Sequence, residues 1–186
     1  MTAPNHRLPR LLIVVGSLRA ASASKALART IAERLDTAAD VVFADIGELP
    51  LYNADIASDP KVEVFIEQVG HADGVLFVTP EYNYSVPGVL KNAIDWASRP
   101  SYQSVFFGKR CFIVSVSGGA MGGVRAQGHL KQILNGMASH LFPSQEVIVP
   151  FANDKVEDGR FTHEPTLEFA TARLMAFLRF TEQVHT

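Results

Sequence analysis

The chain has 186 residues, of which 47% are hydrophobic, and its formal net charge of −2 comes with no run of lysine or arginine. This composition suits one globular domain over residues 1–186, with residues 1–9 flexible, and it argues against nucleic acid or a membrane as partner. Cys111 is the only cysteine, which excludes an internal disulfide and a cysteine metal cluster, so we predict a cytoplasmic protein with no metal site.

The first predicted strand is the apolar run that ends at Gly16, because a run of this length without polar alternation is typical of a strand buried on both faces. A helix is predicted to follow it, from about Ser24 to Leu35. The loop between them carries Ser17, Arg19 and Ser22, and with Ser24 these residues suit a phosphate held at a helix N-terminus. The alternative is that Ser22 or Ser24 only caps the helix and Arg19 is solvated.

Further along the chain, short apolar segments alternate with segments whose apolar residues recur at helical spacing. Strands are predicted over 40–45, Gly74 to Thr79, Cys111 to Val116 and Glu146 to Val149. Helices are predicted over 60–70, 89–97, 124–139 and 165–184, and Asp158-Gly159 is predicted to form a turn. Asp45 is the last residue of the second predicted strand, and we expect a structural or capping role for it, because the glycines of a dinucleotide-binding fingerprint are missing.

Strands that alternate with helices predict a parallel sheet covered on both faces. The unusual loops follow the first, third and fourth strands, and these strand ends are neighbours only in the order 2-1-3-4-5. The sequence therefore predicts an α/β, flavodoxin-like three-layer sandwich with a five-stranded parallel sheet. In such a fold the ligand binds at the switch point between the first and third strands.

The second and third of these loops suit a flat heterocycle. The second is PEYNYSVPG, from Pro80 to Gly88, and it combines tyrosine rings with amide groups. The third is SGGAMGG, from Ser117 to Gly123, whose glycines allow a close approach of the backbone. A phosphate seat beside a ring site matches the shape of FMN. Taken singly, either tyrosine fits an ordinary surface aromatic better than a ligand contact, and it is the whole PEYNYS run beside a glycine-rich loop that favours a ring site.

Together, GSLRAASASKALA, LPLYNAD, TPEYNYSVPGVLKNAIDWASRP and the Ser-Gly-Gly of SGGAMGG resemble the NADPH-dependent FMN reductase family, which includes bacterial quinone and chromate reductases. The resemblance implies non-covalent FMN, NADPH or NADH as co-substrate, and a homodimer or homotetramer. It implies that the FMN phosphate is contacted by Ser17, Arg19, Ser22 and Ser24. It places the flavin ring against Pro80, Glu81, Tyr82, Asn83 and Tyr84 on one side and Ser117, Gly118 and Gly119 on the other.

The expected function is an FMN-dependent oxidoreductase that passes electrons by a ping-pong mechanism from NAD(P)H to a small-molecule acceptor such as a quinone, a flavin or chromate. No catalytic residue is expected, because the flavin itself accepts the hydride. One alternative is an electron-transfer or redox-sensing module without nucleotide turnover. A hydrolase using His129 or His140 lacks a nucleophile motif, and we expect both histidines on the surface or at the end of a helix. The segment from Arg99 to Lys109, polar at first and then apolar, is expected to be an excursion between a helix and a strand. It suits a lid or a subunit contact, and Arg99 to Phe107 are the residues expected to form such a contact.

Overall fold

A six-stranded parallel sheet forms the centre of the computed structural model, which describes residues 7–182. The strands lie in the order β2-β1-β3-β4-β5, and β6 pairs with β4 beyond the end of β5. The strands are β1 (Arg10–Val15), β2 (Asp40–Phe43), β3 (Gly74–Thr79), β4 (Arg110–Val116), β5 (His140–Leu141) and β6 (Val147–Val149). The predicted fold class and strand order are confirmed.

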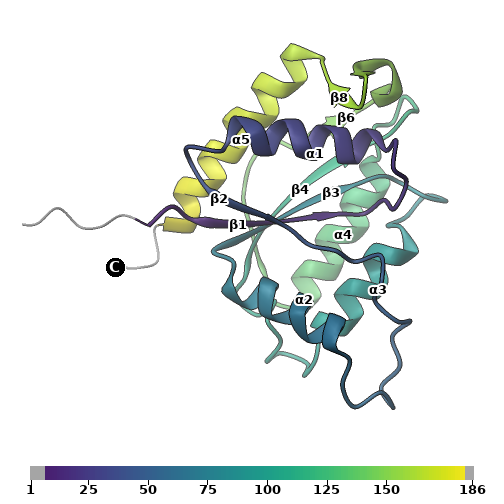
Figure 1. The fold of residues 1–186 in the computed structure, drawn as a ribbon, viewed down its shortest axis with the longest axis vertical. Helices are drawn as coiled ribbons and strands as arrows, with labels where there is room; N and C mark the ends of the chain where they lie inside the picture. The colour runs from purple at the N-terminus through teal and green to yellow at the C-terminus, as the bar shows by residue number, and fades with distance from the viewer. Residues whose placement is uncertain (1–6, 183–186) are drawn as a thin grey trace, which may run out of the picture.

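Helices cover both faces of the sheet, as Figure 1 shows. The helices are α1 (Ala23–Arg34), α2 (Pro60–His71), α3 (Gly88–Ala97), α4 (Val124–Gly136) and α5 (Glu164–Glu182). One core packs α1 and α5 against residues such as Leu11, Ile13 and Val114. The other packs α2, α3 and α4 against the alternate residues of the same strands, such as Leu12, Val14 and Ile113. The central strands are apolar throughout because both of their faces are buried.

The fifth position of the sheet differs from the prediction, because two short strands, β5 and β6, occupy it in place of one. Pro143 lies between them and has no N–H to give to a strand ladder. The buried side chain of Gln127 closes the gap, because its Nε2 donates to the carbonyl oxygens of Ile113 (3.3 Å) on β4 and Val147 (3.2 Å) on β6. A side-chain amide therefore replaces the missing backbone pairing.

The helix before β5 also ends earlier than predicted. Its last residue is Gly136, whereas the apolar spacing predicted a helix as far as Ser139. Ala138 has a left-handed backbone conformation (φ 58°), which stops the helix. His140 consequently lies on β5 and not on a helix or at its end, while His129 lies exposed on α4 as expected. The other helix and strand boundaries agree within about two residues, so far as the described residues extend.

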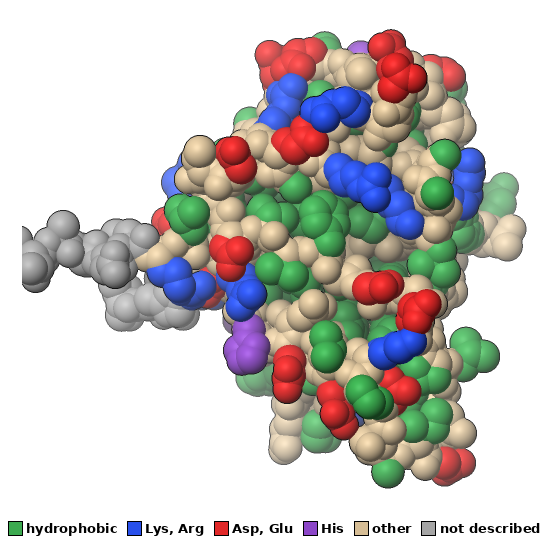
Figure 2. Space-filling view, viewed as in Figure 1, with side chains coloured by type: hydrophobic (Ala, Val, Ile, Leu, Met, Phe, Trp, Pro, Cys, Tyr) green, Lys and Arg blue, Asp and Glu red, His purple; other side chains and the backbone are tan. Residues whose placement is uncertain are grey.

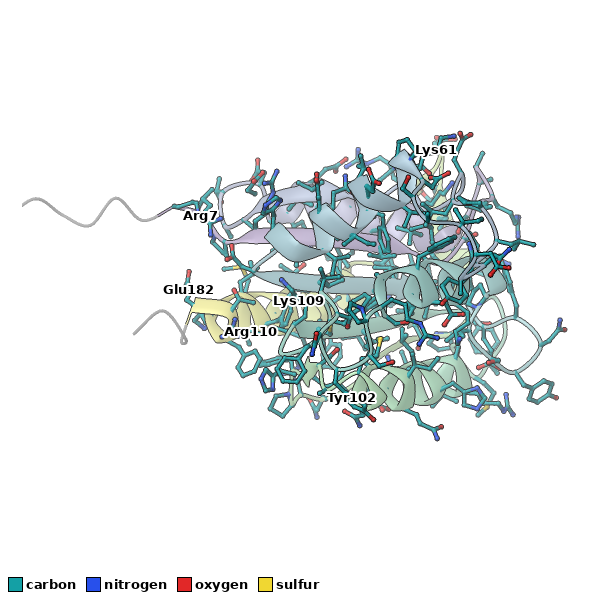
Figure 3. All side chains as sticks on the ribbon, turned by 90° about the horizontal axis from the view of Figure 1, so that it is seen from below. Arg7, Lys61, Tyr102, Lys109, Arg110 and Glu182 are labelled. Carbon is teal, nitrogen blue, oxygen red and sulfur yellow. The ribbon has the colours of Figure 1, made fainter. Side chains whose placement is uncertain are left out.

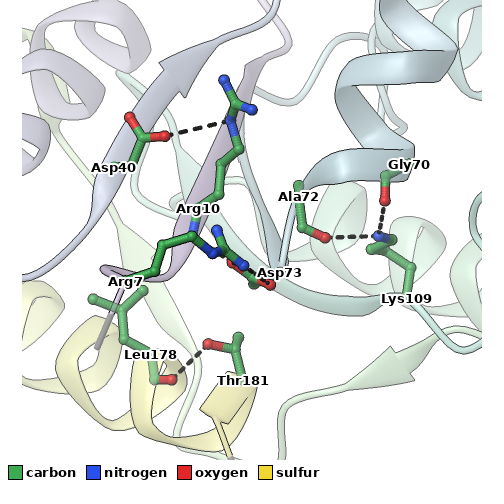
Figure 4. A network of polar contacts seen from close by, with 9 residues as sticks. All are labelled: Arg7, Arg10, Asp40, Gly70, Ala72, Asp73, Lys109, Leu178 and Thr181. Carbon is green, nitrogen blue, oxygen red and sulfur yellow. Dashed lines mark hydrogen bonds and ion pairs between the residues drawn. The ribbon is translucent and has the colours of Figure 1, made fainter. Parts of the chain in front are cut away.

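Charged side chains secure the edge of the sheet where the strands begin, which Figure 3 shows at the end marked by Arg7, Arg110 and Glu182. Arg7 pairs with Asp73 at 3.0 Å. Lys109 donates to the carbonyl oxygens of Gly70 (3.0 Å) and Ala72 (2.7 Å), where α2 ends (Figure 4). Of residues 1–9, for which flexibility was predicted, 1–6 lie outside the described residues.

The excursion after α3 lies at this same edge. Phe106 is buried against Phe77, with ring centroids 6.2 Å apart, and the N–H of Gly108 donates to the carbonyl of Ala138. The segment therefore sits where β4 begins, away from the carboxyl ends of the strands. A lid over this chain's own strand-end loops is excluded by that position, while a subunit contact stays a prediction.

Two local predictions are confirmed. Asp158 and Gly159 both have positive φ and form the turn of an antiparallel hairpin, β7 (Val156–Glu157) and β8 (Arg160–Phe161), which follows the 3-10 helix η1 (Ala152–Lys155). Asp45 has the structural role expected of it, because its Oδ1 accepts the N–H of Gly47 at 3.0 Å. Within residues 7–182, no helix combines the length and the apolar character that crossing a membrane requires.

Candidate functional site

Three loops meet at the edge of the sheet where β1, β3 and β4 end, on the right of Figure 1. They are loop 1 (residues 16–22), loop 2 (residues 80–87) and loop 3 (residues 117–123). The hydroxyl groups of Ser17 in loop 1 and Tyr82 in loop 2 lie 3.4 Å apart. The topology therefore brings together the three segments that the sequence marked as unusual.

Loop 1 ends at a helix start that has free donors. Ser22 is the N-cap of α1, and its Oγ accepts the N–H of Lys25 at 3.4 Å. The N–H groups of Ala23 and Ser24 have no acceptor among the described residues. Open N–H groups at the positive end of a helix dipole suit an anion such as a phosphate.

The side chains of loop 1 divide between the interior and the solvent. Ser17 and Ser24 are each only 2% exposed, so both are almost fully buried. Arg19, in contrast, is exposed to solvent. Gly16 is required by the neighbouring strand, because a Cβ there would lie 2.7 Å from the Oγ1 of Thr79. The loop thus leaves β1 in close contact with β3.

Loop 2 forms a strained hairpin turn. The backbones of Tyr82 and Ser85 exchange two hydrogen bonds of 3.0 and 3.1 Å, and the two residues between them, Asn83 (φ 48°) and Tyr84 (φ 66°), are both left-handed. A bulky residue such as tyrosine rarely adopts this conformation, which costs about 1–3 kcal/mol. Strain of this kind is concentrated at binding sites, and here it holds the Tyr84 ring 68% exposed at the edge of the sheet.

Glu81 fixes loop 2 to α4 by capping that helix. The N-cap residue of α4 is Gly123, which has no side chain to accept the first N–H groups. Instead, Oε2 of Glu81 accepts the N–H of Arg125 (3.0 Å) and of Ala126 (3.3 Å). The Glu81 carboxylate is thus directed at α4, which leaves the backbone of Glu81 for any contact with a bound ring.

Two further contacts attach the same loop to α4. The guanidinium of Arg125 lies 4.4 Å from the centroid of the Tyr84 ring and pairs with Glu81 at 3.2 Å. The Oγ of Ser85 lies 3.0 Å from Nδ1 of His129. Sequence reasoning missed Arg125 and His129 as partners of loop 2, because neither stands in a recognisable motif and each is 44 positions from the residue that it contacts.

Loop 3 is shaped by its glycines. Gly122 (φ 60°) and Gly123 (φ 85°) are left-handed, and a Cβ at Gly122 would lie 2.4 Å from Cγ2 of Ile148. The Oγ of Ser117 accepts the N–H of Gly119 at 3.1 Å. The carbonyl of Gly119 accepts the N–H of Phe151, whose half-exposed ring sequence reasoning did not include in the site.

These groups fit FMN. The open N–H groups of loop 1 suit its phosphate, while the exposed rings of Tyr82 and Tyr84 suit its flat ring. A Cβ at Gly88 would meet nothing within 4 Å, and at Gly119 only Ser117 Oγ at 3.7 Å, so the backbone here is open to a ligand. Within residues 7–182, no group of three or more His, Cys, Asp or Glu side chains is arranged so that it could bind a metal ion.

Comparison with known proteins identifies the family to which the chain belongs. A family model described as NADPH-dependent FMN reductase matches residues 9–154. A 2-hydroxy-1,4-benzoquinone reductase from a Burkholderia species is 42% identical over 163 residues, which cover 86% of this chain and 89% of that protein. A quinone reductase of Escherichia coli K12 is 38% identical over 182 residues, covering 94% of this chain and 96% of that protein.

A solved structure shares the whole fold. The flavoenzyme FerB from Paracoccus denitrificans, an NAD(P)H:(acceptor) oxidoreductase, superposes with a TM-score of 0.85 at 32% identity, covering 95% of this chain and 98% of FerB. These matches confirm the resemblance that the motifs indicated. The chain belongs to the NADPH-dependent FMN reductase family and is an oxidoreductase that uses FMN and NAD(P)H.

Proposed function

We propose that the chain binds FMN across loops 1, 2 and 3 and reduces a quinone with electrons from NAD(P)H. The observation that carries the proposal is the contact between Ser17 and Tyr82 (3.4 Å), which joins the phosphate-type loop to the aromatic loop at one edge of the sheet. The names of the Burkholderia and Escherichia relatives support a quinone as acceptor. A flavin or chromate is a further acceptor of the proposed type.

The residues proposed to hold FMN are those of the three loops. The phosphate is held by the N–H groups that begin α1 and by the side chains of Ser17, Arg19, Ser22 and Ser24. The ring lies against Pro80, Glu81, Tyr82, Asn83 and Tyr84, with Ser117, Gly118 and Gly119 bordering it. When bound, FMN supplies the hydride-accepting centre, so the chain needs no acid or base of its own.

The chain's own contribution is to position the flavin. The Glu81 cap, the Arg125 guanidinium and the Ser85–His129 contact hold loop 2 in one conformation, so that its tyrosines keep one flat surface in place. NAD(P)H and the acceptor then occupy this surface in turn, which gives ping-pong kinetics. We also propose that the protein works in the cytoplasm as a homodimer or homotetramer, which light scattering on the purified protein checks.

An anaerobic titration tests the function. The purified protein is expected to be yellow, to bleach with NADPH or NADH, and to regain its colour with a quinone. Initial rates at several fixed quinone concentrations are expected to give the parallel double-reciprocal lines of a ping-pong mechanism. Tyr102→Ala, on the excursion at the opposite edge, is the matched control for Tyr82→Ala, which is expected to weaken FMN binding.

Two results would contradict the proposal. A purified protein that is colourless and does not bind added FMN would show that the chain has no flavin-binding site. A protein that holds FMN but oxidises neither nucleotide in the presence of a quinone indicates the alternative, an electron-transfer module that a partner protein reduces.

A further inference from the structure

A fourth segment at the end of a strand, residues 150–152 after β6, carries an aromatic side chain that the proposed flavin contacts do not use. β6 ends at Val149, level with Val116 at the end of β4, so this segment lies beside loop 3 at the same edge of the sheet. Phe151 in this segment is 50% exposed. An exposed aromatic side chain that adjoins a binding site is a candidate for contact with a ligand.

Phe151 has a strained backbone that hydrogen bonds to loop 3 hold in place. Its φ of 49° and ψ of 40° are left-handed, a conformation that bulky residues rarely adopt. The N–H of Phe151 donates to the carbonyl of Gly119 (3.2 Å), and the N–H of Ala152 donates to the carbonyl of Ser117 (2.9 Å). Tyr84 in loop 2 also combines a left-handed backbone with an exposed ring. Strained aromatic residues thus stand on both sides of loop 3, and strain of this kind is concentrated at binding sites.

Apolar side chains are exposed along this edge of the sheet. Loop 2 exposes Tyr82 and Tyr84, loop 3 exposes Met121, and the segment after β6 exposes Phe151. Because β4 pairs with β3 on one side and with β6 on the other, these three segments are neighbours. In Figure 2, hydrophobic side chains protrude from the right-hand side of the molecule, where the strands end in Figure 1. Loop 3 itself, SGGAMGG, contains no charged residue, so this edge suits a flat, uncharged molecule.

Phe151 adjoins the proposed flavin site through loop 3. Ser117, Gly118 and Gly119 are proposed to border the flavin ring, and Gly119 is the residue to which the Phe151 backbone is bonded. The same segment approaches Gly118, where a Cβ would lie 2.5 Å from Nδ2 of Asn153. Phe151 therefore stands beside the surface on which NAD(P)H and the acceptor are proposed to bind in turn. A quinone is flat and uncharged and gains most from an aromatic wall, whereas NAD(P)H and chromate are anions.

We propose that Phe151 forms the loop 3 side of the acceptor site and gives that site its preference for flat, uncharged quinones over small anionic acceptors. The inference rests on the proposed function and deepens it, because it assigns the acceptor preference to a named residue. An aromatic ring contributes both buried apolar area and a preferred geometry to its contact with another ring. The fixed backbone of Phe151 lowers the entropy cost of forming that contact.

Phe151→Asn tests the proposal, because asparagine tolerates the left-handed backbone and lacks the ring. In the FMN-loaded protein, anaerobic stopped-flow absorbance follows the two halves of the reaction separately. The variant is expected to be reduced by NADPH at the wild-type rate, but to need about tenfold more 1,4-naphthoquinone for half-maximal reoxidation. Ferricyanide, a small anion, is expected to reoxidise both proteins equally. Phe151→Tyr, which keeps the ring, and Phe169→Ala on α5 are the controls and are expected to match wild type.

Binding without turnover supplies a second measurement. In the absence of NAD(P)H, oxidised FMN has no electrons to give to a quinone, so calorimetry measures the affinity for 1,4-naphthoquinone directly. Phe151→Asn is expected to bind this quinone about tenfold more weakly than wild type and to hold FMN with unchanged affinity. The melting temperature of the variant is expected to equal or exceed that of wild type, because the backbone strain is relieved.

Four results would overturn the inference. Equal affinity of wild type and Phe151→Asn for naphthoquinone would place the ring outside the acceptor site, and a changed oligomeric state in the same variant would assign the ring to a subunit contact. If FMN reduction by NADPH slows as much as reoxidation does, the ring does not distinguish the acceptor. If the variant loses FMN, Phe151 holds the cofactor itself. A failure of the proposed function is distinct, because there the wild-type protein contains no FMN or is not reduced by NAD(P)H.

Discussion

Glu81 and Arg125 are joined twice, because the Glu81 carboxylate accepts the backbone N–H of Arg125 at 3.0 Å and also pairs with its guanidinium at 3.2 Å. The carboxylate is largely buried, with 13% of the Glu81 side chain exposed. The carboxylate therefore provides the N-terminal cap of α4 that Gly123 cannot provide. It does so from loop 2, which follows a different strand, β3. Helix stability and loop position depend on one side chain.

Glu81→Ala is expected to cost about 1 kcal/mol of unfolding free energy, the usual loss for an N-cap, and to weaken FMN binding severalfold because loop 2 is released. Urea unfolding and a fluorescence titration with FMN measure the two effects. Glu81→Gln keeps an oxygen acceptor and is expected to recover part of both, whereas Glu67→Ala on the exposed face of α2 is the control. If Glu81→Ala leaves FMN affinity unchanged, the capping of α4 by Glu81 has no effect on FMN binding.

Arg19→Ala is expected to weaken FMN binding about tenfold, because a charge-assisted contact with the phosphate is lost. Arg19 is exposed, so the free energy of unfolding is expected to stay within about 0.5 kcal/mol of wild type. Riboflavin, which has no phosphate, is the decisive probe. Its affinity should be the same for variant and wild type, and an equal loss for both ligands would place Arg19 away from the phosphate.

Gln127→Leu is expected to destabilise the fold by about 2–4 kcal/mol, because the buried carbonyl oxygens of Ile113 and Val147 both lose their donor. Within residues 7–182 the Oε1 of Gln127 has no hydrogen-bond partner, and removing it offsets a small part of this loss. Thermal unfolding compares the variant with Gln132→Leu on the exposed side of α4. Equal melting temperatures for the two variants would show that the gap between β5 and β6 needs no bridge.

Cys111 gives a prediction about alkaline pH. Burial raises the pKa of its thiol to about 12, against about 8.5 in an unfolded chain. Between these values the unfolded chain has lost the proton that the native chain keeps, so unfolding becomes easier as the pH rises from about 8.5. Cys111→Ala is expected to lack this component of the decline. Ellman's reagent should react with the native protein only at the rate of unfolding, and fast reaction at pH 8 would contradict the burial.

The sequence predicted the strand order because the fold concentrates its unusual residues. Gly16, the PEYNYS run and the glycines after β4 all stand directly after apolar strands, and the ends of parallel strands share one edge. The break in the fifth strand had a signal in Pro143, but its repair by Gln127 had none. A buried glutamine in a helical pattern does not show which carbonyl groups it will meet.

The attachment of loop 2 to α4 was equally beyond the sequence. Glu81, Arg125 and His129 are ordinary surface residue types, and the residues in each contact are 44 positions apart in the chain. Their pairing follows from the position of β3 beside β4, which brings the end of one strand next to the helix after the other. Such contacts become visible only once the topology is known.

The left-handed turn at Asn83 and Tyr84 has a consequence for protein engineering. Replacing Tyr84 by glycine relieves the backbone strain, so a selection for heat resistance alone would favour that change. The same change removes the aromatic ring that stands at the edge of the sheet. A library selected only for thermal stability would therefore lose this ring of the proposed FMN site. Engineering for stability needs catalytic activity as a second selection criterion.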